Sequence, residues 1–416
     1  MFFKNKLLKT NFYLLLIFPI SLVFSRFIAE VILLFTVVNL LRENEFLKSF
    51  FKENWLKFFL LFYFWLILST LQQFNLEHSI KSLAYIRFIL FSLGIVLILD
   101  ELKKFKLFLL SIFITILFVE IDIIIQFIFG KDIFGYIPSN NVRFSGPFGD
   151  ELIAGGFITQ FLSIAFFALF FFLEEKKIKN LQIILFSFFL FSLAAIFITG
   201  ERMSVLLVFL MLILIFLFEK KLRKNLIILF TIFLISSSIF LSKSEMYYKR
   251  YIKQNLIQLG LVFNDVDYKI KDSIYIRVWA SGYNFIKNKP ITGSGLKFYY
   301  HNCDHQDKFL DDIKLANCIH PHNLYLDIIG STGLIGFTFF TLFIITLIIK
   351  YKDKTIHNKK YIYLLNGSLI SLIILLWPIK TSGSFFNNYS SMILYTTIAI
   401  LKTNFRLSNL KANKLN

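Results

Sequence analysis

Apolar stretches of helical length alternate with short polar connections along almost the whole chain. They lie at residues 11–24, 27–41, 56–73, 84–99, 107–130, 152–173, 181–198, 203–218, 226–241, 334–349, 361–377 and 390–401. Each is a candidate span, because a helix needs roughly 20 mostly apolar residues to cross a bilayer. The pattern therefore predicts an all-α polytopic membrane protein of about 12 transmembrane helices, built as a single integral membrane domain over residues 1–416.

The composition supports lipid as the solvent around these helices. Of 416 residues, 57% are hydrophobic and 17% are charged, with 55 phenylalanines. Soluble domains have roughly 45–50% apolar and about 25% charged residues. The excess of apolar side chains excludes a disordered chain, a secreted disulfide scaffold and a soluble α/β enzyme.

The net charge of +19 is distributed between the apolar segments, where basic residues set membrane orientation rather than bind nucleic acid. If the N-terminus is cytoplasmic, the predicted inside connections carry 26 Lys and Arg residues and the short outside connections carry 6. Under the positive-inside rule, this asymmetry predicts that both termini are cytoplasmic. Segment 11–24 follows three lysines, as in a signal peptide, but the apolar segment directly behind it favours an uncleaved helix.

One connection is long: residues 242–321 form a predicted outside segment of 80 residues with 12 Lys and Arg residues. It contains two apolar helix faces. The first comprises Tyr247, Tyr248, Tyr251, Ile252, Leu256 and Leu259, and the second comprises Ile274, Val278, Phe285 and Ile286. Amphipathic helices of this kind lie at a membrane surface, so we expect an extracytoplasmic subdomain that caps the spans.

Arginines are few, and most are predicted on the outer side. The chain has 36 lysines and 9 arginines, of which five are predicted outside: Arg26, Arg143, Arg202, Arg250 and Arg277. A guanidinium suits diphosphate and carboxylate groups because it offers a planar fork of donors. Arg202 lies in the turn 199–202 between two spans. It is either an anion clamp at headgroup depth or a snorkelling side chain paired with Glu201.

The stretch 143–151 contains Gly and Pro turns that bring the backbone close to a ligand or a neighbouring helix. Asp150 and Glu151 either contribute to a site or cap the helix that follows. Upstream, three polar residues lie inside segment 107–130: Glu120, Asp122 and Gln126. Acidic groups at membrane depth mark a functional site by default, unless they pair with a buried partner such as Arg87.

Further candidates lie in the long loop. Gly293-Ser294-Gly295 has the spacing of a weak phosphate-loop pattern, but without a βαβ context we expect a turn there. Arg277, on an amphipathic helix, is either a third anion ligand or part of a solvated face.

Both cysteines and four of the six histidines fall between His301 and His322. In an oxidising compartment, Cys303 and Cys318 would form a disulfide worth about 3 kcal/mol. The alternatives are two free thiols or a zinc site of Cys303, His305, Cys318 and His320, although the spacing lacks a Cys-x-x-Cys knuckle. We therefore expect the disulfide and no metal.

His322 and Asn323 follow Pro321, which suits a helix start, so both are expected in the first helical turn. A histidine kept neutral at a helix N-terminus is a potential general base. The alternative is a histidine that caps the helix or faces lipid headgroups.

Several of these motifs together resemble the bacterial O-antigen ligase and O-antigen polymerase superfamily. They are His322-Asn323 followed by Gly333-x-x-Gly336, the Arg202 turn, the stretch 143–149 and the turn 290–295. The resemblance covers roughly residues 107–350 and includes the single large loop before the third-last span.

The resemblance implies a glycosyltransferase of lipopolysaccharide biosynthesis at the periplasmic face of the bacterial inner membrane. Its donor would be an undecaprenyl-diphosphate-linked glycan, and its acceptor would be lipid A-core or a growing glycan. No metal, nucleotide or other cofactor is implied. The implied site residues are His322 as catalytic base, Arg202, Arg277 and Arg143 as diphosphate ligands, and Asn323 and Glu201 as supporting residues. This chain has Gly149-Asp150-Glu151 where many members have a Pro-Asn pair.

Two other classes of protein share part of the pattern. A flippase for lipid-linked oligosaccharides would have polar residues along a path through the spans. Only Arg87, Glu120 and Asp122 support that interpretation. A non-catalytic scaffold would leave the outer polar groups without a role. We therefore favour an enzyme. Within that class, an O-antigen ligase is the first interpretation and a repeat-unit polymerase is the alternative. Both stay open because the two enzymes share the donor and differ only in the acceptor.

Overall fold

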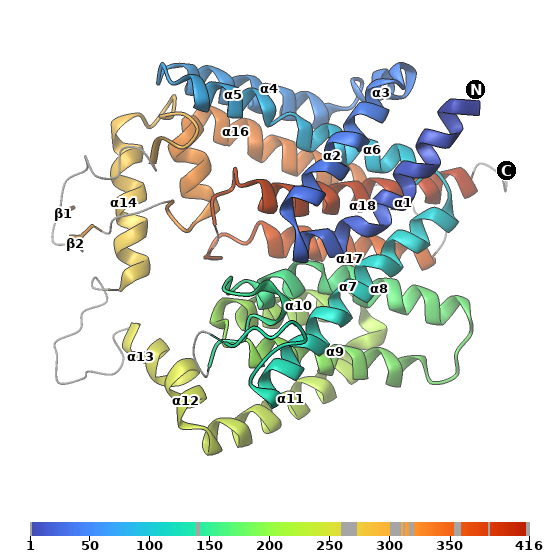
Figure 1. Ribbon diagram of the computed structural model, residues 1–416, viewed down its shortest axis with the longest axis vertical. Coiled ribbons are helices and arrows are strands. Elements are labelled where there is room, and N and C mark those ends of the chain that lie inside the picture. The colour runs from blue at the N-terminus through green and yellow to red at the C-terminus, as the bar shows by residue number, and fades with distance from the viewer. Residues whose placement is uncertain are drawn as a thin grey trace.

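The computed structural model describes residues 2–138, 142–258, 273–299, 309–310, 313–315, 320–352, 359–381 and 383–412. Within these ranges the protein is almost entirely helical, and its long helices run side by side in one bundle (Figure 1). Two short strands, β1 (Phe309–Leu310) and β2 (Ile313–Lys314), pair antiparallel.

The first half of the chain forms α1 (Phe2–Phe24), α2 (Arg26–Leu41), α3 (Asn44–Phe50), α4 (Asn54–Leu71), α5 (Leu76–Ala84), α6 (Arg87–Ile98), α7 (Leu102–Phe129), η1 (Gly146–Phe148), α8 (Ala154–Glu175) and α9 (Leu181–Ile198). The second half forms α10 (Arg202–Phe218), η2 (Lys220–Leu222), α11 (Arg223–Lys243), α12 (Glu245–Tyr248), the π-helical turn η3 (Lys249–Lys253), α13 (Gln254–Gln258), α14 (Ile274–Asn288), α16 (Leu324–Lys352), α17 (Lys359–Leu375) and α18 (Asn388–Ala412).

Each of the twelve apolar segments predicted from the sequence overlaps one of these helices. In the described ranges, eight helices are long and apolar enough to cross a membrane, and α10 and α17 are shorter apolar helices. Helix α18 is less apolar than the other long helices because it contacts protein instead of lipid. Residues 391–405 are all buried, and several of them are serines and threonines. The fold is thus a polytopic helical bundle, and the count of twelve crossings stays a prediction.

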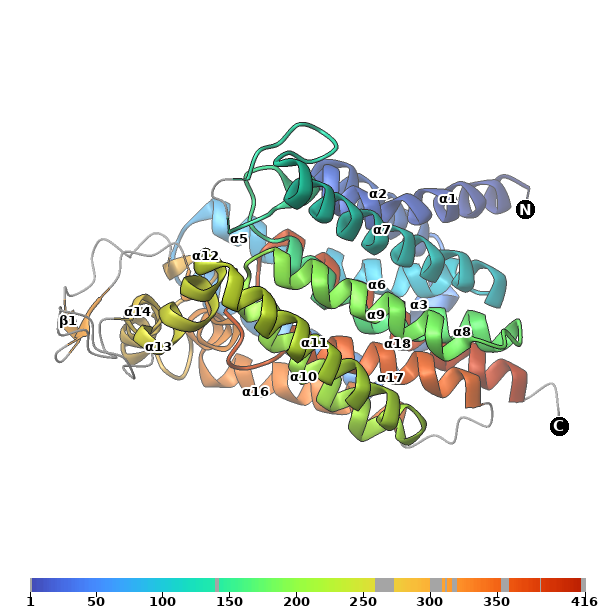
Figure 2. The same ribbon diagram turned by 90° about the horizontal axis from the view of Figure 1, so that it is seen from below.

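The start of α1 and the end of α18 lie at one end of the bundle, and α12, α13 and α14 lie at the opposite end (Figure 2). We call the end with α12, α13 and α14 the loop end. This arrangement agrees with the predicted topology, in which the termini share one side and the long loop lies on the other. Which side is periplasmic stays a prediction.

The two amphipathic faces predicted in the long loop are only partly right. Tyr247, Tyr251 and Val278 are buried as expected, but Tyr248 is 47% exposed and Ile274 is 50% exposed. The first face is interrupted because the chain passes from α12 through the π-helical turn η3, which changes the spacing of side chains along the helix.

Candidate functional site

The turn between α9 and α10 lies at the loop end and is built around Gly200 and Glu201. Gly200 has φ +68°, and a Cβ there would lie 2.0 Å from the carbonyl oxygen of Val142, so the backbone at Val142 passes directly against the turn. Only glycine allows both this backbone conformation and this close approach.

Glu201 binds the start of α8. Its carboxylate accepts hydrogen bonds from the backbone N–H groups of Gly155 and Gly156, both at 2.9 Å, and from Ser204 Oγ at 2.9 Å. Burial raises the pKa of Glu201, while these hydrogen bonds and the positive charge of Arg143 act in the opposite direction. Glu201 therefore caps α8, which is the role considered for Asp150 and Glu151.

Three arginines surround this turn, and we call Arg143, Arg202 and Arg250 the arginine cluster. Arg202 Nη1 donates to Asn255 Oδ1 at 2.8 Å and to Gln258 Oε1 at 3.0 Å. The expected alternative, a pair between Arg202 and Glu201, is therefore wrong, because the arginine is turned towards η3 and α13.

Arg250 completes the cluster. Its Nε donates to the carbonyl oxygen of Gly200 at 3.0 Å. Its pKa is lowered, mainly by burial and then by the positive charges of Arg202 and Arg143. Arg143 Nε is buried and has no hydrogen-bond partner in the described part of the chain, which leaves a donor available to a ligand.

Aromatic packing holds Arg250 at the turn. Tyr247 and Tyr251 stack on Phe197 and donate their hydroxyl groups to the carbonyl oxygens of Ile198 and Phe197, at 2.9 and 2.7 Å. These bonds satisfy carbonyl groups that the end of α9 leaves open. Arg250 was among the arginines predicted outside but not among the predicted site residues; its signal was its place between the two tyrosines.

His322 lies before α16 and not in its first turn, so that expectation is wrong by two residues. The helix begins at Leu324, and Asn323 is its N-cap: Oδ1 accepts from the backbone N–H groups of Tyr325 and Leu326, at 2.9 and 3.2 Å. Asn323 Nδ2 also donates to the carbonyl oxygen of Pro378 at 2.7 Å.

His322 itself is exposed and has φ +47°, a conformation rare for a side chain without glycine's freedom. Its ring centroid lies 4.1 Å from that of His320. His320 is half-buried, and burial, assisted by the charge of His322, lowers its pKa to about 4. The two histidines therefore differ: His322 is accessible to substrate and His320 is held neutral.

The turn 290–295 is inserted into a break in α16 at Gly333 (φ 62°, ψ −172°). Ser294 and Gly295 donate their N–H groups to the carbonyl oxygens of Gly330 and Ser331, both at 2.8 Å. Beyond the break, Leu334 donates its N–H group to the carbonyl oxygen of Pro290 at 2.9 Å. Backbone groups freed by a broken helix inside a bundle need such partners.

Arg277 is not brought to the cluster by its contacts. Its Nε donates to the carbonyl oxygen of Lys314 in β2 at 2.9 Å, and the residue is half-buried. Tyr275, two residues earlier, is close enough to influence the pKa of Arg250. The first turn of α14 is therefore near the cluster, and a role for Arg277 as a diphosphate ligand stays a proposal.

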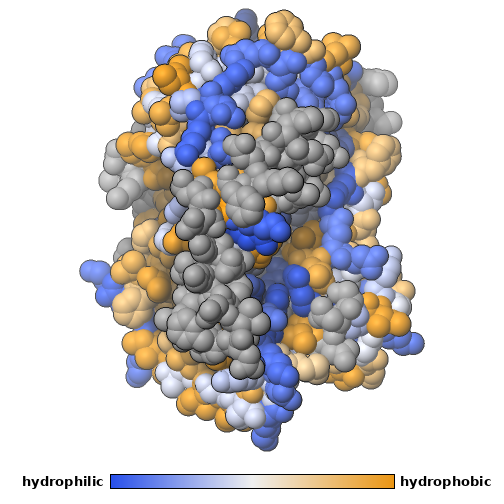
Figure 3. Space-filling model, turned by 90° about the vertical axis from the view of Figure 1, so that its left-hand side faces the viewer, coloured by the Kyte–Doolittle hydropathy of each residue, from blue (hydrophilic) through white to orange (hydrophobic). Residues whose placement is uncertain are grey.

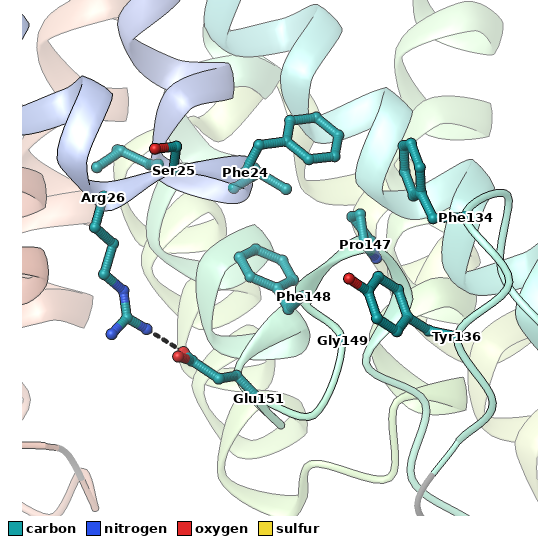
Figure 4. A pocket seen from close by; sticks show the side chains of 11 residues that line it. Phe24, Ser25, Arg26, Phe134, Tyr136, Pro147, Phe148, Gly149 and Glu151 are labelled. Atoms are coloured by element: carbon teal, nitrogen blue, oxygen red, sulfur yellow. Dashed lines mark hydrogen bonds and ion pairs between the residues drawn. The ribbon is translucent and has the colours of Figure 1, made fainter.

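The stretch 143–151 borders a pocket of about 450 Å³ beside the α1–α2 turn. Figure 4 shows Phe24, Phe134 and Phe148 around it, with Arg26 and Glu151 joined as an ion pair at one side. Glu151 thus pairs with Arg26, which is one of the five arginines predicted outside.

Two of the three polar residues singled out in α7, Asp122 and Gln126, hold the loop that follows the helix, whereas both carboxylate oxygens of the buried Glu120 lack a hydrogen-bond partner among the described residues. Asp122 Oδ1 accepts from the N–H group of Ile133 at 2.8 Å, and Gln126 Oε1 accepts from that of Gly146 at 2.8 Å. Arg87 pairs with Glu30 at 3.4 Å, so it does not serve as the buried partner considered for the acidic residues of α7.

Cys303, Cys318 and His305 lie outside the described residues, and the disulfide stays a prediction. Among the residues that the structure does describe, no group of three His, Cys, Asp or Glu side chains could hold a metal ion.

Comparison with known proteins gives one family. Residues 187–341 match the family model described as O-Antigen ligase, a range that runs from α9 into α16 and includes Arg202, Arg250 and His322. No curated protein matches the chain. Residues 187–341 are thus similar to the O-antigen ligase family, in agreement with the resemblance of the sequence motifs to this superfamily.

Proposed function

We propose that the protein is a glycosyltransferase of the periplasmic membrane face that transfers a glycan from an undecaprenyl-diphosphate donor to lipid A-core. The observation that carries the proposal is the arginine cluster, in which three guanidiniums lie around one buried turn with Glu201 already engaged by α8. A diphosphate leaving group needs its charge stabilised as the glycosidic bond breaks, and guanidiniums can do this without a metal ion.

In the proposed reaction, His322 takes the proton from the acceptor hydroxyl. The acceptor oxygen then forms a bond to the anomeric carbon of the first donor sugar. The bond between that carbon and the diphosphate oxygen breaks, and undecaprenyl diphosphate leaves with the electron pair. The exposure of His322 supports this role, because a general base has to reach the acceptor.

The repeat-unit polymerase is the alternative within the same chemistry, since it differs only in acceptor. A strain lacking the protein tests both readings through its lipopolysaccharide ladder. Loss of all glycan from lipid A-core indicates the ligase, whereas a single retained repeat indicates the polymerase. An unchanged ladder would contradict both.

Purified protein in liposomes tests the activity itself. With lipid-linked glycan and lipid A-core as substrates, we expect transfer that continues in the presence of a metal chelator. Movement of the donor across the bilayer without any transfer would indicate a flippase instead.

A further inference from the structure

Lys380 is a buried cation, and it has no counter-ion within the described ranges. It lies in the connection between α17 and α18, and only 9% of its surface is exposed. Within the described ranges, no carboxylate forms an ion pair with it, and no side chain hydrogen-bonds to its ammonium group. Burial lowers the pKa of this ammonium to about 8. Buried charges in folded proteins are paired, so an unpaired one points to a partner that binds.

Asp327 binds the same connection between α17 and α18, but its carboxylate is engaged by other groups. Asp327 Oδ2 accepts from Ser384 Oγ and from the N–H group of Phe385, both at 2.7 Å. Asp327 thus fixes the same connection that carries Lys380, and its carboxylate is bound to the loop backbone instead of the ammonium.

A small pocket adjoins Lys380, and we call it the Lys380 pocket. Its lining includes Gln160, Leu324, Lys380, Ser384, Phe385 and Ser390. Gln160 Oε1 is buried and has no hydrogen-bond partner among the described residues. The ammonium group and the hydroxyl of Ser390 can donate hydrogen bonds to an anion in this space, whereas the hydroxyl of Ser384 already donates to Asp327.

The Lys380 pocket lies between the two parts of the candidate site. Gln160 follows Gly156 by four residues on α8, about 6 Å along the helix, and Gly156 binds Glu201 next to the arginine cluster. Leu324 is the first residue of α16. Asn323, beside His322, donates a hydrogen bond to the carbonyl oxygen of Pro378, in the same connection between α17 and α18 that carries Lys380. At this end of the molecule, hydrophilic residues lie in and beside a recess that hydrophobic residues also border (Figure 3).

We propose that Lys380 binds a phosphate group of a substrate, in the space between the arginine cluster and His322. This inference rests on the proposed function, because the phosphate belongs either to the diphosphate of the lipid-linked donor or to a phosphorylated sugar of the acceptor. Lys380 lies outside the residues that match the family model, 187–341.

Binding measurements on the full-length protein test the inference without any need for transfer. Inorganic pyrophosphate and undecaprenyl diphosphate are titrated into wild type, Lys380→Gln and the matched control Lys289→Gln, which removes an exposed lysine of the loop end. If the donor supplies the phosphate, Lys380→Gln weakens binding of both ligands at least about ten-fold, and Lys289→Gln leaves it unchanged.

If the acceptor supplies the phosphate, donor binding is unchanged, and Lys380→Gln raises the KM for a phosphorylated acceptor but not for the dephosphorylated one. Unchanged binding and unchanged KM in a variant with the wild-type melting temperature would overturn the inference.

Lys380→Gln should fold, because it removes an unpaired buried charge. Lys380→Arg keeps the charge, serves as the second variant and should retain binding. Pyrophosphate binding that depends on Lys380 in a protein without transferase activity would refute the proposed function alone.

Discussion

Arg202 uses one end of its guanidinium fork within the protein, since Nη1 bridges Asn255 and Gln258. The remaining donors are directed by this anchoring, which a lysine cannot reproduce with a single ammonium group. The precision of the proposed diphosphate site therefore depends on residue type and not only on charge.

We expect Arg202→Lys to lose most transfer activity and Arg202→Ala to lose at least as much, because the fork positions the leaving group. Transfer in reconstituted membranes measures this. The control is Arg223→Lys, at the start of α11, where the arginine donates to the carbonyl oxygen of Phe216 near the far end of α10. Normal transfer by Arg202→Lys would mean that charge alone, or nothing, is needed at this position.

His320 gives a pH dependence of stability. Its pKa is lowered to about 4 in the folded protein, against 6.5 for an ordinary histidine. The unfolded chain therefore binds more protons between these values, and folding stability is lost as the pH falls from about 6.5 towards 4.

We expect His320→Asn to lose less thermal stability over that pH range than wild type, because asparagine does not titrate. Melting temperatures in detergent at pH 4.5 and 7.5 measure the difference. Equal losses in the two proteins would show that His320 is not held neutral by the fold.

At the scale of elements, the break in α16 joins three parts of the chain. The turn 290–295 fills the break, and Gln73 Nε2 at the end of α4 donates to the carbonyl oxygen of Ser294 at 2.6 Å. Trp65 Nε1 of α4 donates to the carbonyl oxygen of Thr332 at 2.8 Å. The break thus fixes the position of the loop end relative to the bundle.

Gly333→Ala should destabilise the protein by about 1–3 kcal/mol or more and reduce transfer, because Gly333 has a left-handed φ and its new Cβ would lie 2.2 Å from the carbonyl oxygen of Ile291. The matched control is Gly330→Ala in the same helix, whose nearest neighbour would be 3.9 Å away. Melting temperature and transfer measured together check this. Equal behaviour of the two variants would contradict the inserted turn.

Some of the site could be predicted from the sequence, and the reasons are physical. The short Arg202 turn and the Gly-rich turn 290–295 are local features that composition reveals. Other features depend on contacts between residues far apart in the chain. They are the hydrogen bonds of Glu201 to α8, the position of Arg250 at Gly200, and the lack of an ion-pair partner for Lys380 among the described residues. The start of α16 lies two residues later than predicted, because Asn323 is a better N-cap than the residues before it.

On the scale of the whole molecule, apolar length and periodicity were enough to predict the helices but not how they contact one another. Helix α18 illustrates this: its burial inside the bundle permits polar residues that lipid would exclude. The prediction of which loops lie on which side of the membrane depends on charge asymmetry alone, so it calls for a direct test.

Impermeant thiol labelling of intact cells tests the topology in a background without Cys303 and Cys318. We expect a cysteine at position 287 in α14 to be labelled and a cysteine at position 221 in η2 to be protected, since the loop end is predicted outside. Labelling of position 221 but not of position 287 would invert the topology.

The most direct test of the account compares His322→Ala with His320→Ala in the reconstituted transfer assay, with and without a metal chelator. We expect His322→Ala to lose about 10²–10⁴-fold in rate, which is what a positioned base contributes, while binding of undecaprenyl diphosphate is kept. His320→Ala should retain most of its activity, and the chelator should leave wild type unchanged. An active His322→Ala protein, with or without an inactive His320→Ala protein beside it, would contradict the central claim that His322 is the base.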